Sequence, residues 1–339
     1  MASTRNLLCI ALLALLAFTS SVAHAQTEVR VALVIGNGAY SHVPALPNPR
    51  NDSQKIAQKL TAIGFQVTEQ ENLTNEGFRR ALRDFARLAK RKGFKHQPSA
   101  AWVASKSPET ARQIYLGMAR ELKQAGFNVN FGPVVDINLN PDNPIIGKLG
   151  RSFGNSDAKV MTYAREFIEA HWQHGIVTCA KHFPGHGSAS GDTHKVEAHI
   201  DAINRNLETQ VYLDLAQKKL LDSVMVAHLL TKNERSLPAT LDPERYQFLR
   251  SMVGFQGVAF SDDMNMEAVR KRFSFEDGLV MTVNAGTDVV VLGNVLHYDP
   301  QIAKKAFDIL LASVKAGKIK KSRIEEAYRR IIKLKNKYH

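Results

Sequence analysis

Side chains able to carry acid, base or nucleophile chemistry directly follow the apolar runs of this sequence. They are Asp136, Lys181-His182, His228, Asp262-Asp263 and Asn294. Continuous apolar runs of this kind are typical of parallel strands buried on both faces. In a β/α barrel, the C-terminal ends of such strands carry the active site. One polar residue there could be a helix cap, but five sets in phase predict a single catalytic rim.

A second pattern places a carboxylate shortly before an imidazole, at Asp192 and His194. An imidazole ordinarily titrates at about pH 6.5, so it can give or take a proton near neutrality. A paired carboxylate fixes the tautomer and the orientation of the ring. Taken alone, Asp-x-His is better explained as a solvated loop histidine, so its interpretation depends on the neighbouring motifs.

The chain that must position these groups has 339 residues, of which 44% are apolar and 23% are charged. This length predicts one large α/β domain or two ordinary ones, and the composition excludes a disordered chain. The formal net charge of +13 makes acidic polymers or membrane surfaces plausible partners. No run of Lys and Arg carries the interleaved aromatic residues of a single-strand binder, so nucleic acid is not an expected partner.

Residues 1–25 have the features of a cleaved secretory signal. Arg5 provides a positive charge, Leu7 to Phe18 is apolar, and Ala23-His24-Ala25 is a small-x-small cleavage site. The apolar run is too short to span a bilayer, and no later stretch is long and apolar enough to do so. We therefore expect a periplasmic or secreted protein without an integral membrane segment. Cys179 is the one cysteine of the mature chain, so no internal disulfide can form.

The elements expected along the mature chain change at a seam near residues 87–94. Before the seam the pattern is strand, helix, strand and helix, at residues 31–35, 51–63, 65–67 and from Asn75 onward. After it, helices opened by Ser107 and Ser156 alternate with apolar strands at residues 129–131, 176–180, 224–227, 258–260 and 289–292. Such alternation predicts a parallel β/α fold. The expected domains are residues 26–90 and 91–339.

The segment at residues 29–88 contains the strings A-L-V-I-G-N and P-N-P-R-N-D. It resembles the opening of the bacterial caspase-like (metacaspase) peptidases. In that family the catalytic His and Cys follow a third and a fourth strand, and neither strand occurs before the seam. Cys179 lies in an apolar run and is expected to be a small core residue. A caspase-like cysteine peptidase is therefore the least favoured function.

A larger set of motifs follows the seam in a fixed order. They are Phe131 to Asp136, Gly150 to Gly154, Lys181 to Gly187, Asp192 to His194, Pro238 to Leu241, and Ser261 to Met264. From about Arg91 to the C-terminus, the chain resembles family 3 glycoside hydrolases of the β-N-acetylhexosaminidase branch. The resemblance implies an α/β fold with a (β/α)8-type, TIM-like barrel. It also implies hydrolysis of a terminal β-linked N-acetylglucosamine, usually from peptidoglycan fragments, with no cofactor.

The resemblance also implies a role for each matching residue. Asp262 matches the nucleophile of retaining hydrolysis, and Asp263 is left as a cap of the following helix. His194, held by Asp192, matches an acid/base that replaces the usual carboxylic acid. The loop at residues 187–191 is expected to be flexible and to close over substrate. The residues that match sugar-hydroxyl contacts are Arg151, Lys181 and His182.

Two further expectations concern the same region. The Lys181 ammonium, at the end of a buried strand, needs a polar partner, either a ligand hydroxyl or Asp136. His186 could be mistaken for a metal ligand with His182 and His194. Their spacing fits no standard zinc motif, so no metal is expected.

The resemblance also reveals what the chain lacks. The family's barrel begins with strands missing here, among them one ending in an Asp-Gln-Glu-Gly-Gly segment whose Asp grips the sugar. Arg87 could match a binding Arg after that segment, or it could belong to the Arg-rich helix. Two interpretations stay open. In one, the caspase-like strands pair with the strand after Gly126 and close a distorted barrel of reduced activity; in the other, the chain is a non-catalytic glycan-binding or vestigial fusion. The oligomeric state is open.

Overall fold

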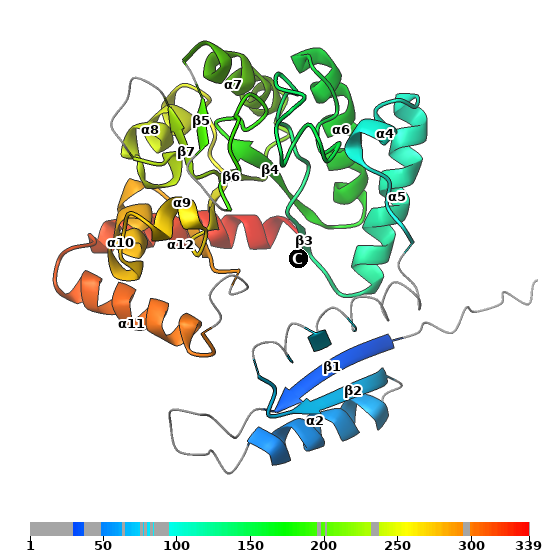
Figure 1. Cartoon of the computed structure of the whole chain (residues 1–339), viewed down its shortest axis with the longest axis vertical. Coiled ribbons are helices and arrows are strands. Elements are labelled where there is room, and N and C mark those ends of the chain that lie inside the picture. Colours follow the sequence, from blue (N-terminus) through cyan, green and yellow to red (C-terminus); the bar gives the residue numbers. More distant parts are fainter. Residues whose placement is uncertain are drawn as a thin grey trace, which may run out of the picture. The chain divides into compact units, whose positions relative to one another are not determined.

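The structure is a computed structural model that describes residues 30–36, 49–62, 65–74, 77, 80–81, 84, 95–194, 198–200, 202–231, 237–293 and 299–338. The chain divides into two compact units, Met1–Phe94 and Lys95–His339 (Figure 1). The division falls at the C-terminal end of the expected seam. The predicted signal, Arg87 and Asn294 lie outside the described residues.

The first unit contains two parallel strands and a helix. Strand β1 (Arg30–Gly36) pairs with β2 (Phe65–Glu71) in one unbroken register, and helix α2 (Pro49–Ala62) connects them. The helix begins before the expected cap at residues 51–53, because proline suits the first turn of a helix. Ser53 therefore lies inside the helix, where its hydroxyl donates to Glu69 Oε1 at 3.1 Å. Of the Arg-rich helix expected from Asn75, only residues 77, 80, 81 and 84 are described, and they are helical.

The second unit is built on a sheet of parallel strands that follow one another in chain order. They are β3 (Val129–Asn130), β4 (Val177–Phe183), β6 (Ser223–Val226), β8 (Val258–Asp263) and β9 (Val289–Val291). Each apolar run expected to be a strand after the seam forms one, so that prediction is confirmed. Over the described residues this sheet corresponds to the half of a barrel. Closure of an eight-stranded barrel, and pairing of β1 or β2 with β3, stay predictions.

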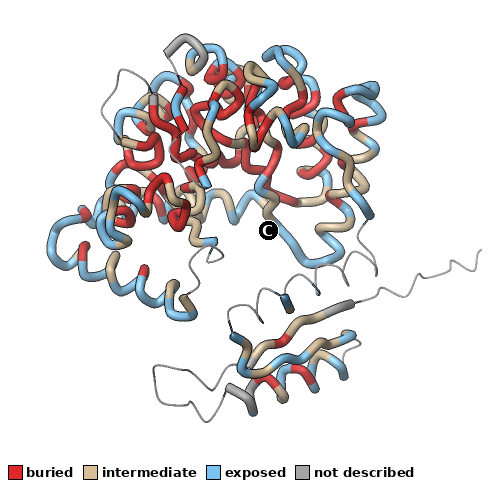
Figure 2. The backbone as a smooth tube through the Cα atoms, viewed as in Figure 1, coloured by how far each residue is buried: buried red, intermediate tan, exposed pale blue. Residues whose placement is uncertain are grey.

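Helices surround this sheet. They are α4 (Ala100–Val103), α5 (Pro108–Gln124), α6 (Asp157–Gln173), α7 (Ala202–Gln217), α8 (Pro243–Ser251), α9 (Glu267–Arg270), α10 (Phe275–Ala285), α11 (Ile302–Lys315) and α12 (Lys321–Lys337). The predicted caps are confirmed, since Ser107 accepts from Thr110 N and Ser156 from Lys159 N. Helices α5, α6 and α7 lie side by side (Figure 1). Buried residues gather in the strands and on the helix faces toward them (Figure 2).

A small second sheet was not expected from the sequence. Strand β5 (Ala198–Ile200) pairs in parallel with β7 (Leu229–Thr231), which directly follows His228. Its apolar residues pack with Ala189 and Ala227 in a buried cluster. This sheet therefore attaches the chain after His194 to the C-terminal end of β6. Within the described residues, no helix has both the length and the apolar character needed to cross a membrane.

Candidate active site

Asp136 organises the turn that follows β4. His182 Nδ1 lies 2.7 Å from Asp136 Oδ2, and the amides of His182 and His186 donate to Oδ1 at 3.1 and 2.8 Å. Burial by itself would raise the pKa of Asp136, but the neighbouring histidines and their hydrogen bonds lower it to about 2. The buried carboxylate is therefore ionised and accepts hydrogen bonds. Its hydrogen-bond partner is His182, whereas the sequence suggested Lys181.

This contact fixes the tautomer of His182. Because an ionised carboxylate only accepts, the proton is assigned to Nδ1, and Nε2 is left as an acceptor. Arg151 Nη2 lies 3.4 Å from that Nε2, while Arg151 Nη1 donates to the Ile145 carbonyl at 3.0 Å. Two of the three predicted sugar-binding residues therefore lie in contact.

Lys181 lies between these groups and β8. Burial lowers the pKa of its ammonium and the Arg151 charge lowers it further, while Asp262 counteracts both. It forms no ion pair with a carboxylate in the described part of the chain. Lys181 is half-buried, and no hydrogen bond ties its ammonium to a carboxylate in the described residues. Such a cation is suited to bind the hydroxyl of a ligand.

Asp262 is the penultimate residue of β8 and lies near two histidines and Lys181. Its Oδ1 accepts the amide of Asp263 at 2.8 Å. Burial would raise the pKa of Asp262, but His228, His182 and that hydrogen bond, together with Lys181, lower it below its ordinary value. The carboxylate is therefore ionised at neutral pH, as a nucleophile must be.

Asp263 has a different task from the one predicted. Its Oδ1 accepts the amides of Asn265 at 3.0 Å and of Gly293 at 2.8 Å. Helix α9 begins after Met266 and has no side-chain cap. Asp263 is therefore not a helix cap; it connects the end of β8 to the end of β9.

His228 is part of the predicted rim, but it was not among the assigned site residues. Its Nε2 donates to the Asp263 carbonyl at 2.9 Å, and its Nδ1 lies 2.8 Å from Thr240 Oγ1. Burial lowers the pKa of His228, and the Asp262 charge raises it in part. The neutral ring thus carries its proton on Nε2. Thr240 belongs to the motif Pro238 to Leu241. The contact shows that one task of this motif is to hold the His228 ring at the rim.

The predicted dyad forms within one turn. His194 Nδ1 lies 2.8 Å from Asp192 Oδ1, which also accepts the His194 amide at 3.0 Å. Since the carboxylate binds Nδ1, Nε2 is the ring nitrogen left to face a substrate. The His194 side chain is 51% exposed.

Thr193 connects this turn to the strand that carries Asp262. Thr193 is buried; its hydroxyl lies 3.4 Å from His186 Nε2, and its carbonyl accepts the Ala268 amide at 3.4 Å. Ala268 lies in α9, shortly after β8. His194 also lies close enough to His228 to contribute to the lowered pKa of His228, and His228 lies near Asp262. The fold thus brings the dyad and the candidate nucleophile to the same rim.

The loop at residues 187–191 is only partly as predicted. Its first residues, Gly187 to Ala189, are fixed by hydrogen bonds, and Ala189 is fully buried. Ser190 is exposed. The first part of the loop is therefore fixed, because its polar backbone is already satisfied, and flexibility from Ser190 toward the dyad stays a prediction.

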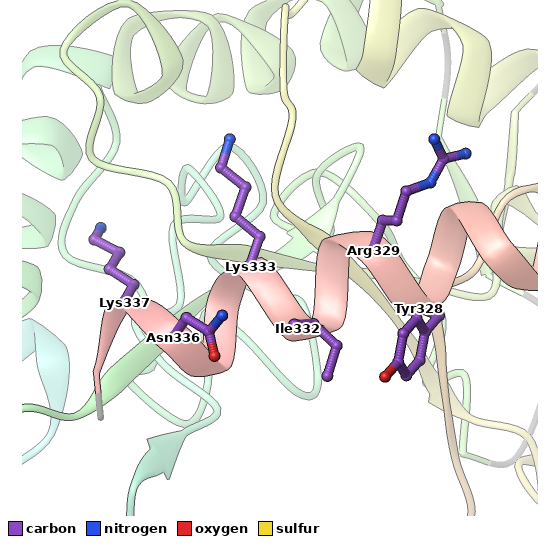
Figure 3. A pocket seen from close by; sticks show the side chains of 6 residues that line it. All are labelled: Tyr328, Arg329, Ile332, Lys333, Asn336 and Lys337. Carbon is purple, nitrogen blue, oxygen red and sulfur yellow. The ribbon is translucent and has the colours of Figure 1, made fainter.

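Other groups of the molecule lie apart from this chemistry. A hollow on α12, lined by Tyr328, Arg329, Ile332, Lys333, Asn336 and Lys337, contains none of the candidate residues (Figure 3). Over the described ranges, no three His, Cys, Asp or Glu side chains lie where they could hold a metal ion. Cys179 is buried, and burial raises the pKa of its thiol to about 12. It is a core residue, as predicted.

Comparison with known proteins decides the family. A family model described as the glycosyl hydrolase family 3 N terminal domain matches residues 86–334. The chain belongs to glycosyl hydrolase family 3. A second model, described as the caspase domain, matches residues 29–96. That shorter match agrees with the resemblance of the N-terminal segment.

Family 3 relatives agree in sequence and in fold. Beta-hexosaminidase LpqI of Mycobacterium tuberculosis is 30% identical over 254 residues, which are 70% of this chain and 62% of the relative. Beta-hexosaminidase of Photobacterium profundum is 33% identical over 57% of this chain and 60% of its own length. The chain thus spans less than two thirds of these relatives.

Solved structures of family 3 members have the same fold. A β-N-acetylglucosaminidase from Paenibacillus has a TM-score of 0.67 at 25% identity, over 92% of this chain and 61% of the other. A family 3 member from Mycobacterium smegmatis has a TM-score of 0.63 at 28% identity, over 70% of this chain and 75% of the other.

Proposed function

We propose that this protein is a retaining glycosidase that releases terminal β-linked N-acetylglucosamine from peptidoglycan-type fragments or related β-hexosaminides. The observation that carries the proposal is the Asp192–His194 dyad, held by Thr193 against the segment that follows ionised Asp262. The names of the family 3 relatives, which are β-hexosaminidases, support the same substrate class.

The reaction has two steps. In the first, an Asp262 carboxylate oxygen attacks the anomeric carbon, and the bond to the leaving oxygen breaks. The electron pair goes to that oxygen, which takes the proton from His194 Nε2. In the second step, neutral His194 takes a proton from water, and the water oxygen displaces Asp262 from the anomeric carbon. Asp192 holds the imidazole through Nδ1 in both steps.

The three binding residues have separate tasks in this scheme. Arg151 and Lys181 donate to sugar hydroxyls, and Asp136 orients His182 so that its Nε2 faces the same space. Without the sugar-gripping Asp of the missing segment, less binding energy is available to orient the substrate, so both affinity and turnover fall. We therefore expect a working but slow enzyme.

The deciding experiment uses the mature full chain and an aryl β-N-acetylglucosaminide. We expect release of the aryl group, and NMR of the first-formed sugar should show the β anomer. Release of the α anomer would overturn the retaining mechanism, and no release would overturn the activity.

The missing segment favours a second candidate, a non-catalytic glycan-binding or vestigial protein. A glycan-binding protein should show a melting temperature that rises with N-acetylglucosamine but no release of the aryl group. Calorimetry with the sugar and the turnover assay, on the same preparation, together separate the two candidates.

Export and the N-terminal unit complete the proposal. Residues 1–25 act as a signal that is removed, so the enzyme works in the periplasm or outside the cell. N-terminal sequencing of the exported protein tests this, and a protein beginning at Met1 would contradict it. We regard residues 29–88 as a partial caspase-like segment and expect no peptidase activity from it, because its sequence predicts neither of the strands that the catalytic His and Cys of that family follow.

A further inference from the structure

A buried carboxylate on α7 has no part in the two-step reaction. Glu208 Oε2 accepts the Gly187 amide at 2.9 Å, and Oε1 accepts the Ser188 amide at 2.8 Å. The residue is 1% exposed. Burial raises the pKa of Glu208 to about 8, and the hydrogen bonds from Gly187 and Ser188 counteract this only in part. Burying an acid in this way is costly unless its hydrogen bonds are needed, so its position requires a reason.

Glu208 can lie this close to the turn after β4 only because residue 185 is a glycine. A Cβ atom on Gly185 would lie 2.1 Å from Glu208 Oε2. Any other residue at this position would force the carboxylate away from the two amides. The glycine of the motif and the glutamate of α7 therefore form one arrangement, although 23 positions separate them in the chain.

The carbonyl groups of the same segment are fixed from the opposite side. Asn143 Nδ2 donates to the carbonyls of His186 at 2.7 Å and of Ala189 at 2.8 Å, and the Asn140 amide donates to Gly187 O at 3.1 Å. Further along the chain, buried Thr193 contacts His186 Nε2 and accepts the Ala268 amide, and strand β5 begins at Ala198. The dyad thus lies between the fixed start of the loop and β5.

We propose that Glu208 is a positioning residue for the acid/base dyad, which it serves by fixing the first part of the loop that carries Asp192 and His194. This inference rests on the proposed function. A general acid acts only when its donor atom reaches the leaving oxygen, and displacement of about 1 Å can cost 100-fold in rate. Glu208 holds the start of the loop at Gly187 and Ser188, and this fixes where the chain toward Asp192 and His194 begins.

The kinetic test compares Glu208→Gln with Asp214→Asn. Gln keeps the size of the side chain but turns an amide donor toward one of the two backbone amides, so one anchor is lost. Asp214 lies on the same helix, and its carboxylate accepts from exposed Gln210. We expect Glu208→Gln to lower kcat about 10- to 100-fold for poor leaving groups, with a smaller loss for good ones and a nearly unchanged KM. Asp214→Asn should match the parent.

Hydrogen exchange provides a second measurement that does not depend on activity. In the full chain, Glu208→Gln should speed exchange of the Gly187 and Ser188 amides by at least about tenfold, while strand β4 keeps its protection. If Glu208→Gln does not fold, Glu208→Asp keeps both acceptor oxygens on a shorter side chain, and the same two measurements apply.

The outcomes separate the two proposals. A parent chain that turns over no aryl glycoside refutes the function, and exchange alone then decides whether Glu208 anchors the loop. Equal losses of kcat for every leaving group, or unchanged exchange at Gly187 and Ser188, would overturn the positioning role.

Discussion

At the scale of residues, two adjacent aspartates at the end of β8 have different surroundings. Asp262 faces His228, His182 and Lys181, which favour its ionised form. Asp263 uses its carboxylate to accept the amides of Asn265 and Gly293. We therefore expect Asp262 to act as the nucleophile and Asp263 to hold the ends of the two strands together.

The first prediction therefore separates the pair. Asp262→Asn should lower kcat by at least about 1,000-fold, because it removes the nucleophile while keeping the shape. Asp263→Asn should instead lower the melting temperature, since it weakens the connection between β8 and β9. Steady-state kinetics and calorimetry on both variants check this. The reverse pattern, with turnover lost only in Asp263→Asn, would place the nucleophile one residue later.

The second prediction concerns the dyad. His194→Ala should slow both steps, and the loss should shrink for substrates with good leaving groups, which need less protonation. Asp192→Asn should cause a smaller loss, because it misorients the ring without removing it. A series of aryl glycosides with leaving groups of different pKa measures both effects. Equal losses across the series would argue against an acid role for His194.

The third prediction uses the low pKa of Asp136. Because its folded pKa, about 2, is below that of the unfolded chain, the stability it contributes is present above about pH 4 and is lost as the pH falls through 2. The difference in melting temperature between the parent and Asp136→Asn should therefore shrink over that range. Asp214→Asn, which removes an aspartate that accepts only from exposed Gln210, is the control for the change of charge. A difference that is independent of pH for Asp136→Asn would be the contrary result.

At the scale of elements, the segment from His186 to Ala189 connects β4 to the loop of the dyad. Its backbone is packed so closely that a Cβ atom on Gly187 would lie 1.7 Å from the Ile137 carbonyl oxygen. Backbone cannot move aside as a flexible side chain can. A residue larger than glycine at position 187 would therefore displace the whole turn. Precise placement of the dyad thus depends on the packing of this short segment.

The fourth prediction tests that packing with a matched pair of substitutions. Gly187→Ala should destabilise the second unit strongly. Gly117→Ala, on α5, meets no atom within 4 Å and should stabilise the chain by about 0.5–1 kcal/mol, as alanine does in a helix interior. Calorimetry of both variants decides the matter. Equal melting temperatures would show that the turn adapts easily.

At the scale of the whole molecule, the two units differ in what they can bury. The first unit offers two strands and a helix, of whose described apolar residues Val34 and Ala57 are buried. The second has a large continuous core. Its sheet ends at β3 and β9, and over the described residues each of these strands has one neighbour. Bare edge strands pair with other chains and promote aggregation.

The fifth prediction follows from these edges. Because we expect β1 or β2 to pair with β3, removing residues 26–90 should leave that edge bare and make the rest of the chain aggregate. Residues 26–94 alone should not fold, because so small a core cannot offset the loss of chain entropy. Light scattering and thermal melting of the fragments measure this. A soluble fragment of residues 95–339 that melts cooperatively would show that the second unit is independent.

Local patterns in the sequence were enough to predict much of the second unit. Apolar runs predicted its five parallel strands, because continuous burial leaves a signature in consecutive residues. Ser107 and Ser156 predicted two helix starts, because a cap acts within one turn. The family resemblance predicted the contact between Asp192 and His194, and two residues of one turn need no distant element to meet.

Only the tertiary structure decided which partners the other polar groups take. Asp136 binds His182, Asp263 connects two strand ends, and Glu208 reaches Gly187. Each of these contacts joins residues far apart in the chain. The sequence places polar groups at one rim but does not state which of them meet, because hydrogen-bond pairing depends on how strands and helices pack. For the same reason Asp262 and Asp263, with nearly the same neighbours in sequence, acquire different tasks only in the folded chain.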